Sequence, residues 1–179
     1  WLPKGIRLGL KVDDLKKLRP NAVTFGQLGD KISGSKPKSQ DILYLERAEV
    51  ENVPMAIAYS IKSGNLVTIS LAAHFKQEAF KKERDKFITQ MVASHGTKFD
   101  RCVKTVTAHD FEYKNPCMEW KYPQLTIYAI VTREFRDVKP QFGEIQYIIT
   151  SERIFGDPAI QHAVRDEGKQ LFSDIDKVV

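Results

Sequence analysis

The clearest pattern in the chain is an alternation of apolar and polar positions that stops once and then resumes. Apolar side chains occupy every second position from Met55 to Ile61 and again from Val67 to Leu71. Successive side chains of a strand point to opposite faces, so each run predicts a strand with one buried face. The interruption, Lys-Ser-Gly-Asn at 62–65, contains a glycine suited to a tight turn. We therefore expect a β-hairpin.

A helical period replaces this alternation over residues 75–94. Four large apolar side chains fall on one stripe: Phe80, Phe87, Ile88 and Met91. The charged residues lie largely on the remaining face, which is typical of an amphipathic helix. Gly96 is the expected end of this long helix, because glycine adopts the left-handed backbone that often follows a last turn.

A shorter helix is expected near the N-terminus. Val12, Leu15 and Leu18 recur every three residues, and Pro20 cannot continue a helix and biases the preceding residue out of the helical region. The stretch that follows, through 34–39, is rich in turn formers and is expected to be a loop.

The second half of the chain contains further β-prone runs. They span residues 101–108, 125–133 and 144–150, with a possible short strand at 117–120. Lys-Tyr-Pro-Gln at 121–124 suggests a second hairpin, since Pro123 belongs in a turn rather than in a central strand.

A C-terminal helix is expected to begin at Asp157, an N-cap residue followed by Pro158 at the first helical position. Its apolar residues have near-helical spacing, with a possible break at Gly168; they are Ile160, Val164, Leu171 and Ile175.

Together these elements predict an α+β fold in which one domain occupies residues 1–179. The long helix would pack on one face of an antiparallel sheet, and the other face would be solvated or used for a partner. Nothing resembles the alternating strand-helix repeat of a parallel dinucleotide-binding sheet. A hydrophobic content of 42% and a charged content of 28% fit a packed globular domain.

The net charge of +5 changes this picture little, because 23 acidic residues are spread among 28 basic ones. No zinc-finger spacing, aromatic nucleic-acid-binding motif or helix-turn-helix pattern is present, so specific nucleic-acid binding is not expected. No run approaches the roughly twenty apolar residues of a membrane span. The printed chain opens at Trp1 without an initiator Met, which favours an exported protein and allows membrane association only through an unseen N-terminal anchor.

The two cysteines, Cys102 and Cys117, flank the stretch 110–116, which we interpret as a turn. A disulfide between them is plausible and is favoured by export to an oxidising compartment; the alternative is a pair of partly buried free thiols. Two cysteines without CxxC or HxxxH spacing do not predict a structural zinc site.

Catalytic and cofactor motifs are weak. Cys102, His109 and Asp110 could form a nucleophilic site, but neighbouring strand residues point to opposite faces, so we favour a surface turn. His162 and Asp166 have the spacing of one helix face and are interpreted as a solvated pair. The segment 29–36 fails the phosphate-loop pattern, because no Lys directly follows its second Gly. The scattered histidines at 74, 95, 109 and 162 add no motif, so we predict no catalytic residue, metal or cofactor.

Two groups of basic residues could meet an anionic surface, but nearby acids favour solvated helix faces. The first group is Arg7, Lys11, Lys16, Lys17 and Arg19, and the second is Lys81, Lys82, Arg84 and Lys86. Trp120, Tyr122 and Tyr128 are candidate interface residues, because Trp and Tyr anchor contacts while a polar tip stays wet. For Trp120 the sheet core is the favoured position.

Three segments resemble small bacterial envelope proteins, namely outer-membrane-assembly lipoproteins and the β-lactamase-inhibitor-protein-like fold. They are Gly-Ile-Arg-Leu-Gly-Leu at 5–10 with the helix at 12–18, the hairpin at 59–69, and the long helix closing at His95-Gly96 with Trp120 on a later strand. The resemblance implies a non-catalytic role in binding another protein. We therefore expect an exported protein-binding or envelope-assembly module, periplasmic or otherwise extracytoplasmic. The alternatives are an enzyme whose site the sequence does not reveal, and a cytoplasmic location.

Overall fold

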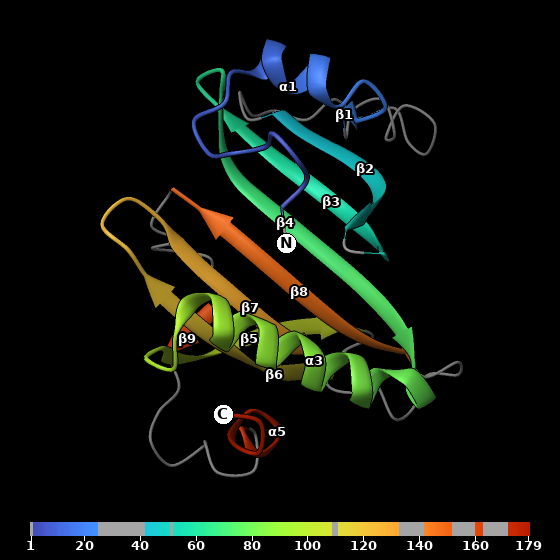
Figure 1. Ribbon diagram of the computed structural model, residues 1–179, viewed down its shortest axis with the longest axis vertical. Helices are drawn as coiled ribbons and strands as arrows, with labels where there is room; N and C mark the ends of the chain where they lie inside the picture. Colours follow the sequence, from blue (N-terminus) through green and yellow to red (C-terminus); the bar gives the residue numbers. More distant parts are fainter. Residues whose placement is uncertain are drawn as a thin grey trace. The chain divides into compact units, whose positions relative to one another are not determined.

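The computed structural model in Figure 1 describes residues 2–24, 42–50, 52–108, 111–132, 142–151, 160–162 and 172–179. The protein is α+β and mostly antiparallel sheet, with few helices. Its contacts form two compact units, Trp1–Ala73 with Ile148–Glu152 and His74–Tyr147 with Arg153–Val179. Two strands, β4 (Asn65–Lys76) and β8 (Phe142–Thr150), contribute residues to both units.

The first unit is built on the predicted hairpin. Strands β1 (Val23–Thr24), β2 (Ile42–Val50), β3 (Val53–Lys62) and β4 follow one another in an antiparallel order. The turn between β3 and β4 has positive φ at Ser63 (51°) and Gly64 (76°). These angles are those of the tight turn whose twist matches a hairpin, so the hairpin prediction is confirmed.

A β-bulge changes which side chains of β4 face the core. The alternation predicted Val67 on the inner face, but Leu66 is fully buried instead. Ser60 pairs with Thr68 and the next residue, Ile61, pairs with Leu66, so Val67 is the extra residue of the bulge. One inserted residue shifts the inward positions by one, and the period returns at Ile69.

Helix α1 (Val12–Leu18) confirms the predicted N-terminal helix, which ends before Pro20. Only Leu15 of its expected stripe is buried, whereas Leu18 is 46% exposed. The preceding segment is fixed to the start of β4 through backbone hydrogen bonds, since Leu66 N–H donates to Leu10 O at 2.8 Å.

The second unit carries the strand order β8-β7-β6-β5-β9. Its further strands are β5 (Asp100–Ala108), β6 (Phe111–Lys121), β7 (Thr126–Thr132) and β9 (Ile160–His162). The strands expected at 101–108, 125–133 and 144–150 are present as β5, β7 and β8, and the predicted hairpin joins β6 to β7.

Strand β6 is longer than the four residues expected, and the predicted turn at 110–116 is wrong. Lys114, Asn115 and Pro116 belong to β6, where Pro116 pairs with Val103 of β5. The register between β6 and β7 begins at Cys117, so the missing N–H of Pro116 does not interrupt that second ladder.

Helix α3 (Gln77–His95) matches the predicted long helix. Figure 1 shows it lying across the strands of the second unit. Its buried residues are the four predicted ones: Phe80, Phe87, Ile88 and Met91. Gly96 ends the helix with φ 89°, and its N–H donates to Val92 O at 2.8 Å. The predicted long helix and its four buried residues are therefore present in an α+β fold that is mostly antiparallel sheet.

The predicted C-terminal helix is wrong at residues 160–162. Residues Ile160–His162 form strand β9 rather than helix, pairing with residues 102–104 of β5. The edge of β5 presents backbone N–H and C=O groups that need hydrogen-bond partners, and a neighbouring strand supplies them whereas a helix does not. This requirement outweighs the helical spacing of the apolar residues in the local sequence. The expected helix positions Asp157, Pro158, Val164, Gly168 and Leu171 lie outside the described residues. Helix occurs only at α5 (Ser173–Asp176) within residues 172–179, where Ile175 is buried.

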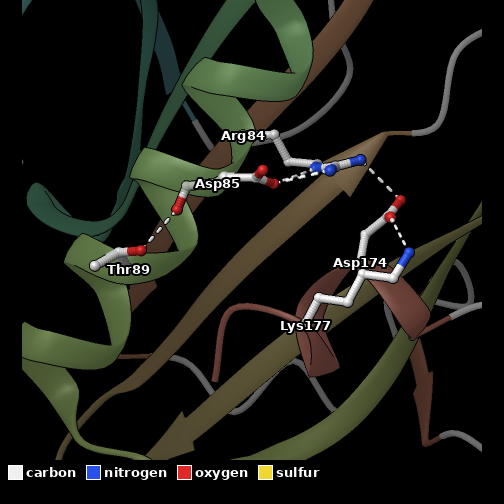
Figure 2. A network of polar contacts seen from close by, with 5 residues as sticks. All are labelled: Arg84, Asp85, Thr89, Asp174 and Lys177. Atoms are coloured by element: carbon white, nitrogen blue, oxygen red, sulfur yellow. Dashed lines mark hydrogen bonds and ion pairs between the residues drawn. The ribbon is translucent and has the colours of Figure 1, made fainter.

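Ion pairs tie α5 to α3 within this unit, as Figure 2 shows. Arg84 of α3 contacts Asp174 of α5 at 2.8 Å and its own neighbour Asp85 at 2.8 Å, while its side chain is 12% exposed. Lys177 extends the network to Asp174 at 3.9 Å. Arg84 is thus engaged in structure rather than available for an anionic partner.

Candidate functional site

The β6–β7 hairpin and the end of α3 bring together the most distinctive side chains of the second unit. The hairpin loop closes where Tyr122 N–H donates to Leu125 O at 2.9 Å, and the last ladder pair is Lys121 with Thr126. Pro123 lies in this loop, as predicted. We call the side chains around this loop the hairpin site; they are His95, Asp100, Glu119, Trp120, Lys121, Tyr122, Tyr128 and Tyr147.

Trp120 anchors one face of the hairpin site to the helix. Its indole is buried, and its Nε1–H donates to Gly96 O at 2.9 Å. Its ring centroid lies 5.4 Å from that of His95 and 5.5 Å from that of Phe99. The core position predicted for Trp120 is confirmed, and its hydrogen bond fixes strand β6 against the end of α3.

The imidazole of His95 is the centre of this aromatic face. It stacks on buried Tyr147 with an interplanar angle of 14° and a centroid distance of 6.1 Å. The exposed Tyr122 ring meets it edge-on at 6.5 Å, with the Tyr122 hydroxyl 3.4 Å from His95 Nδ1. Burial lowers the pKa of His95 and raises the pKa of Tyr147 to about 12, so both rings favour their neutral forms.

The opposite face of the same hairpin end is polar. Glu119, with a side chain 7% exposed, accepts a hydrogen bond from Tyr128 OH at 3.0 Å. Lys121 Nζ lies 3.3 Å from Glu119 Oε2 and 2.8 Å from Asp100 Oδ2. The hydrogen bond to Asp100 raises the pKa of Lys121. Glu119 and Lys121 thus neutralise each other, which suits fixed binding groups better than proton transfer.

Tyr122 is the exposed aromatic side chain of the hairpin site, with 43% of its surface exposed. Its neighbours Trp120, Tyr128 and Tyr147 are buried. A large ring presented to solvent on a rigid support is the arrangement of a contact anchor, because little side-chain freedom is left to lose on binding.

The two cysteines are directly paired across β5 and β6. Cys102 and Cys117 are both buried, with Cα atoms 4.9 Å apart and sulfur atoms at bonding distance. This separation lies inside the limit of about 7 Å for a disulfide. The geometric condition is confirmed, although Lys114, Asn115 and Pro116 lie in strand β6 rather than in the predicted turn.

The other predicted combinations are not brought together. His109 and Asp110 of the proposed nucleophilic site lie outside the described residues, as do the segments 29–36 and 34–39. His74 contacts Glu144 at 3.3 Å and His162 pairs with Cys102 in register, so the histidines stay scattered. Because His162 is in a strand, its interpretation as part of a helix face with Asp166 is wrong. Across the described ranges no three His, Cys, Asp or Glu side chains are grouped to hold a metal ion.

The sequence does not single out five members of the hairpin site, which are His95, Asp100, Glu119, Lys121 and Tyr147. His95 precedes the helix-ending Gly96, and that position at a helix end was its only local signal. Glu119 lies inside the strand expected at 117–120, but its hydrogen bond to Tyr128 depends on the pairing of β6 with β7. His95 and Glu119 both depend on contacts distant in sequence.

No protein-family model, curated protein or solved structure matches the chain. The resemblance to envelope proteins therefore stays a prediction. No helix in the described part of the chain is long and apolar enough to cross a membrane.

Proposed function

We propose that this chain is a non-catalytic, extracytoplasmic module that binds another protein through the hairpin site. The observation that carries the proposal is the exposed ring of Tyr122, held edge-on against His95, which itself stacks on buried Tyr147. Tyrosine is enriched among the residues that dominate binding energy, and such residues are surrounded by contacts that exclude water.

Charged groups at the rim of the site fit a protein surface. Lys121 is half exposed and lies between Glu119 and Asp100, so a partner meets both signs of charge next to an aromatic anchor. An apolar centre with a mixed polar rim is the usual composition of a protein–protein interface. Rim charges of this kind set orientation and association rate more than affinity.

The cysteine pair supports the extracytoplasmic part of the proposal. Cys102 and Cys117 are at disulfide distance and buried, so an oxidising compartment would close the bond and protect it from reductants. The cellular compartment is tested by quenching the source cells with acid and then alkylating the free cysteine thiols of the protein. An extracytoplasmic protein yields both cysteines protected from alkylation until reduction, whereas two alkylated cysteines would contradict export.

Binding is tested with a photoreactive phenylalanine analogue in place of Tyr122. The same analogue at exposed Lys86 on α3 is the matched control. The proposal predicts one discrete protein adduct from position 122 and none from position 86. With the cross-linked partner purified, Tyr122→Ala should weaken binding at least about tenfold and Tyr122→Phe much less, because the ring supplies the contact. Identical adducts from both positions, or none, would argue against the hairpin site.

A further inference from the structure

Within the described ranges, the outer edge of β2 is paired along only part of its length. Strand β1 pairs with β2 at two positions, Leu45 and Tyr44, whereas β3 pairs with β2 along its whole length. Among the described residues, no strand pairs with the outer edge of 46–50, and Figure 1 draws no labelled strand beside that half of β2. An edge of this kind presents backbone N–H and C=O groups that can pair with another chain.

The register identifies which backbone groups face outward. Val50 and Val53 pair across the loop that joins β2 to β3, and the residues that close such a tight hairpin exchange their hydrogen bonds with each other. Backbone groups alternate in direction along a strand, so those of Arg47 and Glu49 point away from β3.

The side chains of Arg47 and Glu49 are exposed and lie on the same face of β2, with Ala48 between them. The structure shows no ion pair or hydrogen bond from either side chain to another described residue. Opposite charges two residues apart on one strand edge are complementary to a second copy of the same edge running antiparallel.

We propose that two copies of this chain associate by antiparallel pairing of their β2 edges about a two-fold axis at Ala48. This axis places Arg47 opposite the partner's Glu49, and the symmetry repeats the pair. The backbone groups of Arg47 and Glu49 also point outward. Arg47 and the Glu49 of the second copy would therefore be joined both by an ion pair and by backbone hydrogen bonds. Ala48 meets its own copy at the close position between them, where a small side chain fits.

Charge and backbone direction together select this register. An axis at Arg47 would place two arginines opposite each other, and an axis at Glu49 would do the same with two glutamates; both are unfavourable cross-strand pairs. An axis midway between two residues would place a residue whose backbone groups point outward opposite one whose backbone groups point toward β3. The two strands could then not form the hydrogen bonds of an antiparallel pair. Because the edge at 46–50 is short, we expect a concentration-dependent dimer rather than an obligate one.

Sedimentation velocity of the full chain over a concentration series tests this dimer. Arg47→Glu and Glu49→Arg each create two like-charge pairs, so each should weaken dimerisation by at least about tenfold. The double variant R47E/E49R restores opposite charges in the same register and should bring the dissociation constant back to within about threefold of the unchanged chain. Circular dichroism checks that all three variants keep the fold.

A cysteine cross-link provides an independent measurement. In an antiparallel close pair the Cα atoms are about 4.5 Å apart, which permits a disulfide. Ala48→Cys should therefore give a covalent dimer on mild oxidation, whereas Ala56→Cys, an exposed alanine on the neighbouring strand β3, should not.

Three outcomes would overturn the proposal. The first is a chain that stays monomeric up to about 1 mM, where even weak specific association is detectable; the charges would then only protect the edge from pairing. The second is a double variant no better than the single ones. The third is equal cross-linking at positions 48 and 56. None of these results bears on the hairpin site, whose test uses other residues.

Discussion

Gly143 of β8 lies directly beneath the ring of Phe80 on α3. A Cβ at position 143 would come closer than 3.0 Å to three carbons of that ring. Glycine within a strand weakens it, and its use here is explained by the close approach of the helix side chain. The position of α3 on its sheet thus depends on the absence of a side chain at 143.

Gly143→Ala should lower the free energy of unfolding by about 1–3 kcal/mol, because the methyl group forces Phe80 or the helix to move in a packed core. Urea denaturation of both proteins measures the difference. Phe80→Leu in the Gly143→Ala background frees space and should recover part of the loss. An alanine at 143 that costs nothing would show that α3 does not press on β8 in this way.

The sequence predicted the elements that pack along one whole face, because burial in such elements follows the regular spacing of the apolar side chains. The β3–β4 hairpin and helix α3 each bury one face against a single layer. The regular spacing of residues such as Ile57 and Phe87 is then enough to predict that they are buried. The first half of strand β6, before the short strand expected at 117–120, was not predicted because Asn115 and Pro116 are local turn formers, whereas their pairing with β5 is a distant contact. Strand β9 has three residues, too few for a period to show.

The hairpin site likewise contains residues that the sequence singles out and residues that it does not. Trp120 and Tyr122 were singled out because their chemistry is visible in any context. His95 and Glu119 became part of the site only through a helix end and a strand neighbour that sequence spacing does not reveal. The Arg19–Glu46–Tyr59 cluster of the first unit was missed for the same reason, since its three residues come from separate elements.

Tyr59→Phe should destabilise the protein by about 1–3 kcal/mol, since it removes a hydrogen bond to a buried carboxylate. The Glu46 side chain is 4% exposed, accepts a bond from Arg19 Nε at 2.7 Å, and accepts another from Tyr59 OH. Burial raises the pKa of Tyr59, so the phenol remains a donor at neutral pH. Tyr44→Phe, on the neighbouring strand, is the matched control, because no hydrogen bond from the Tyr44 hydroxyl to a described residue is shown. Equal, small effects of both changes on chemical denaturation would contradict the role of the cluster.

Reduction should lower the melting temperature of the native protein if Cys102 and Cys117 form the bond that their geometry permits. The chain-entropy model gives about 3 kcal/mol for a loop of this size. Calorimetry with and without reductant measures the shift, and the double variant C102A/C117A should show the lower melting temperature without reductant and no further response to it. Two titratable thiols in the air-exposed native protein would count against the bond.

Folding stability should fall on acidification through the titration of His95. Burial lowers the pKa of His95 below its ordinary value of 6.5, so between the two values the unfolded chain binds a proton that the folded chain does not. Stability then rises with pH across that window, is fully present above about pH 6.5 and is lost as the pH falls toward the lowered pKa.

His95→Gln should flatten this part of the profile of unfolding free energy against pH. A direct reading comes from the NMR titration of the His95 imidazole, whose midpoint should lie below 6.5. A midpoint above that value would mean that the end of α3 and the surrounding rings stabilise the imidazolium more than burial disfavours it, and the sign of the pH dependence would reverse.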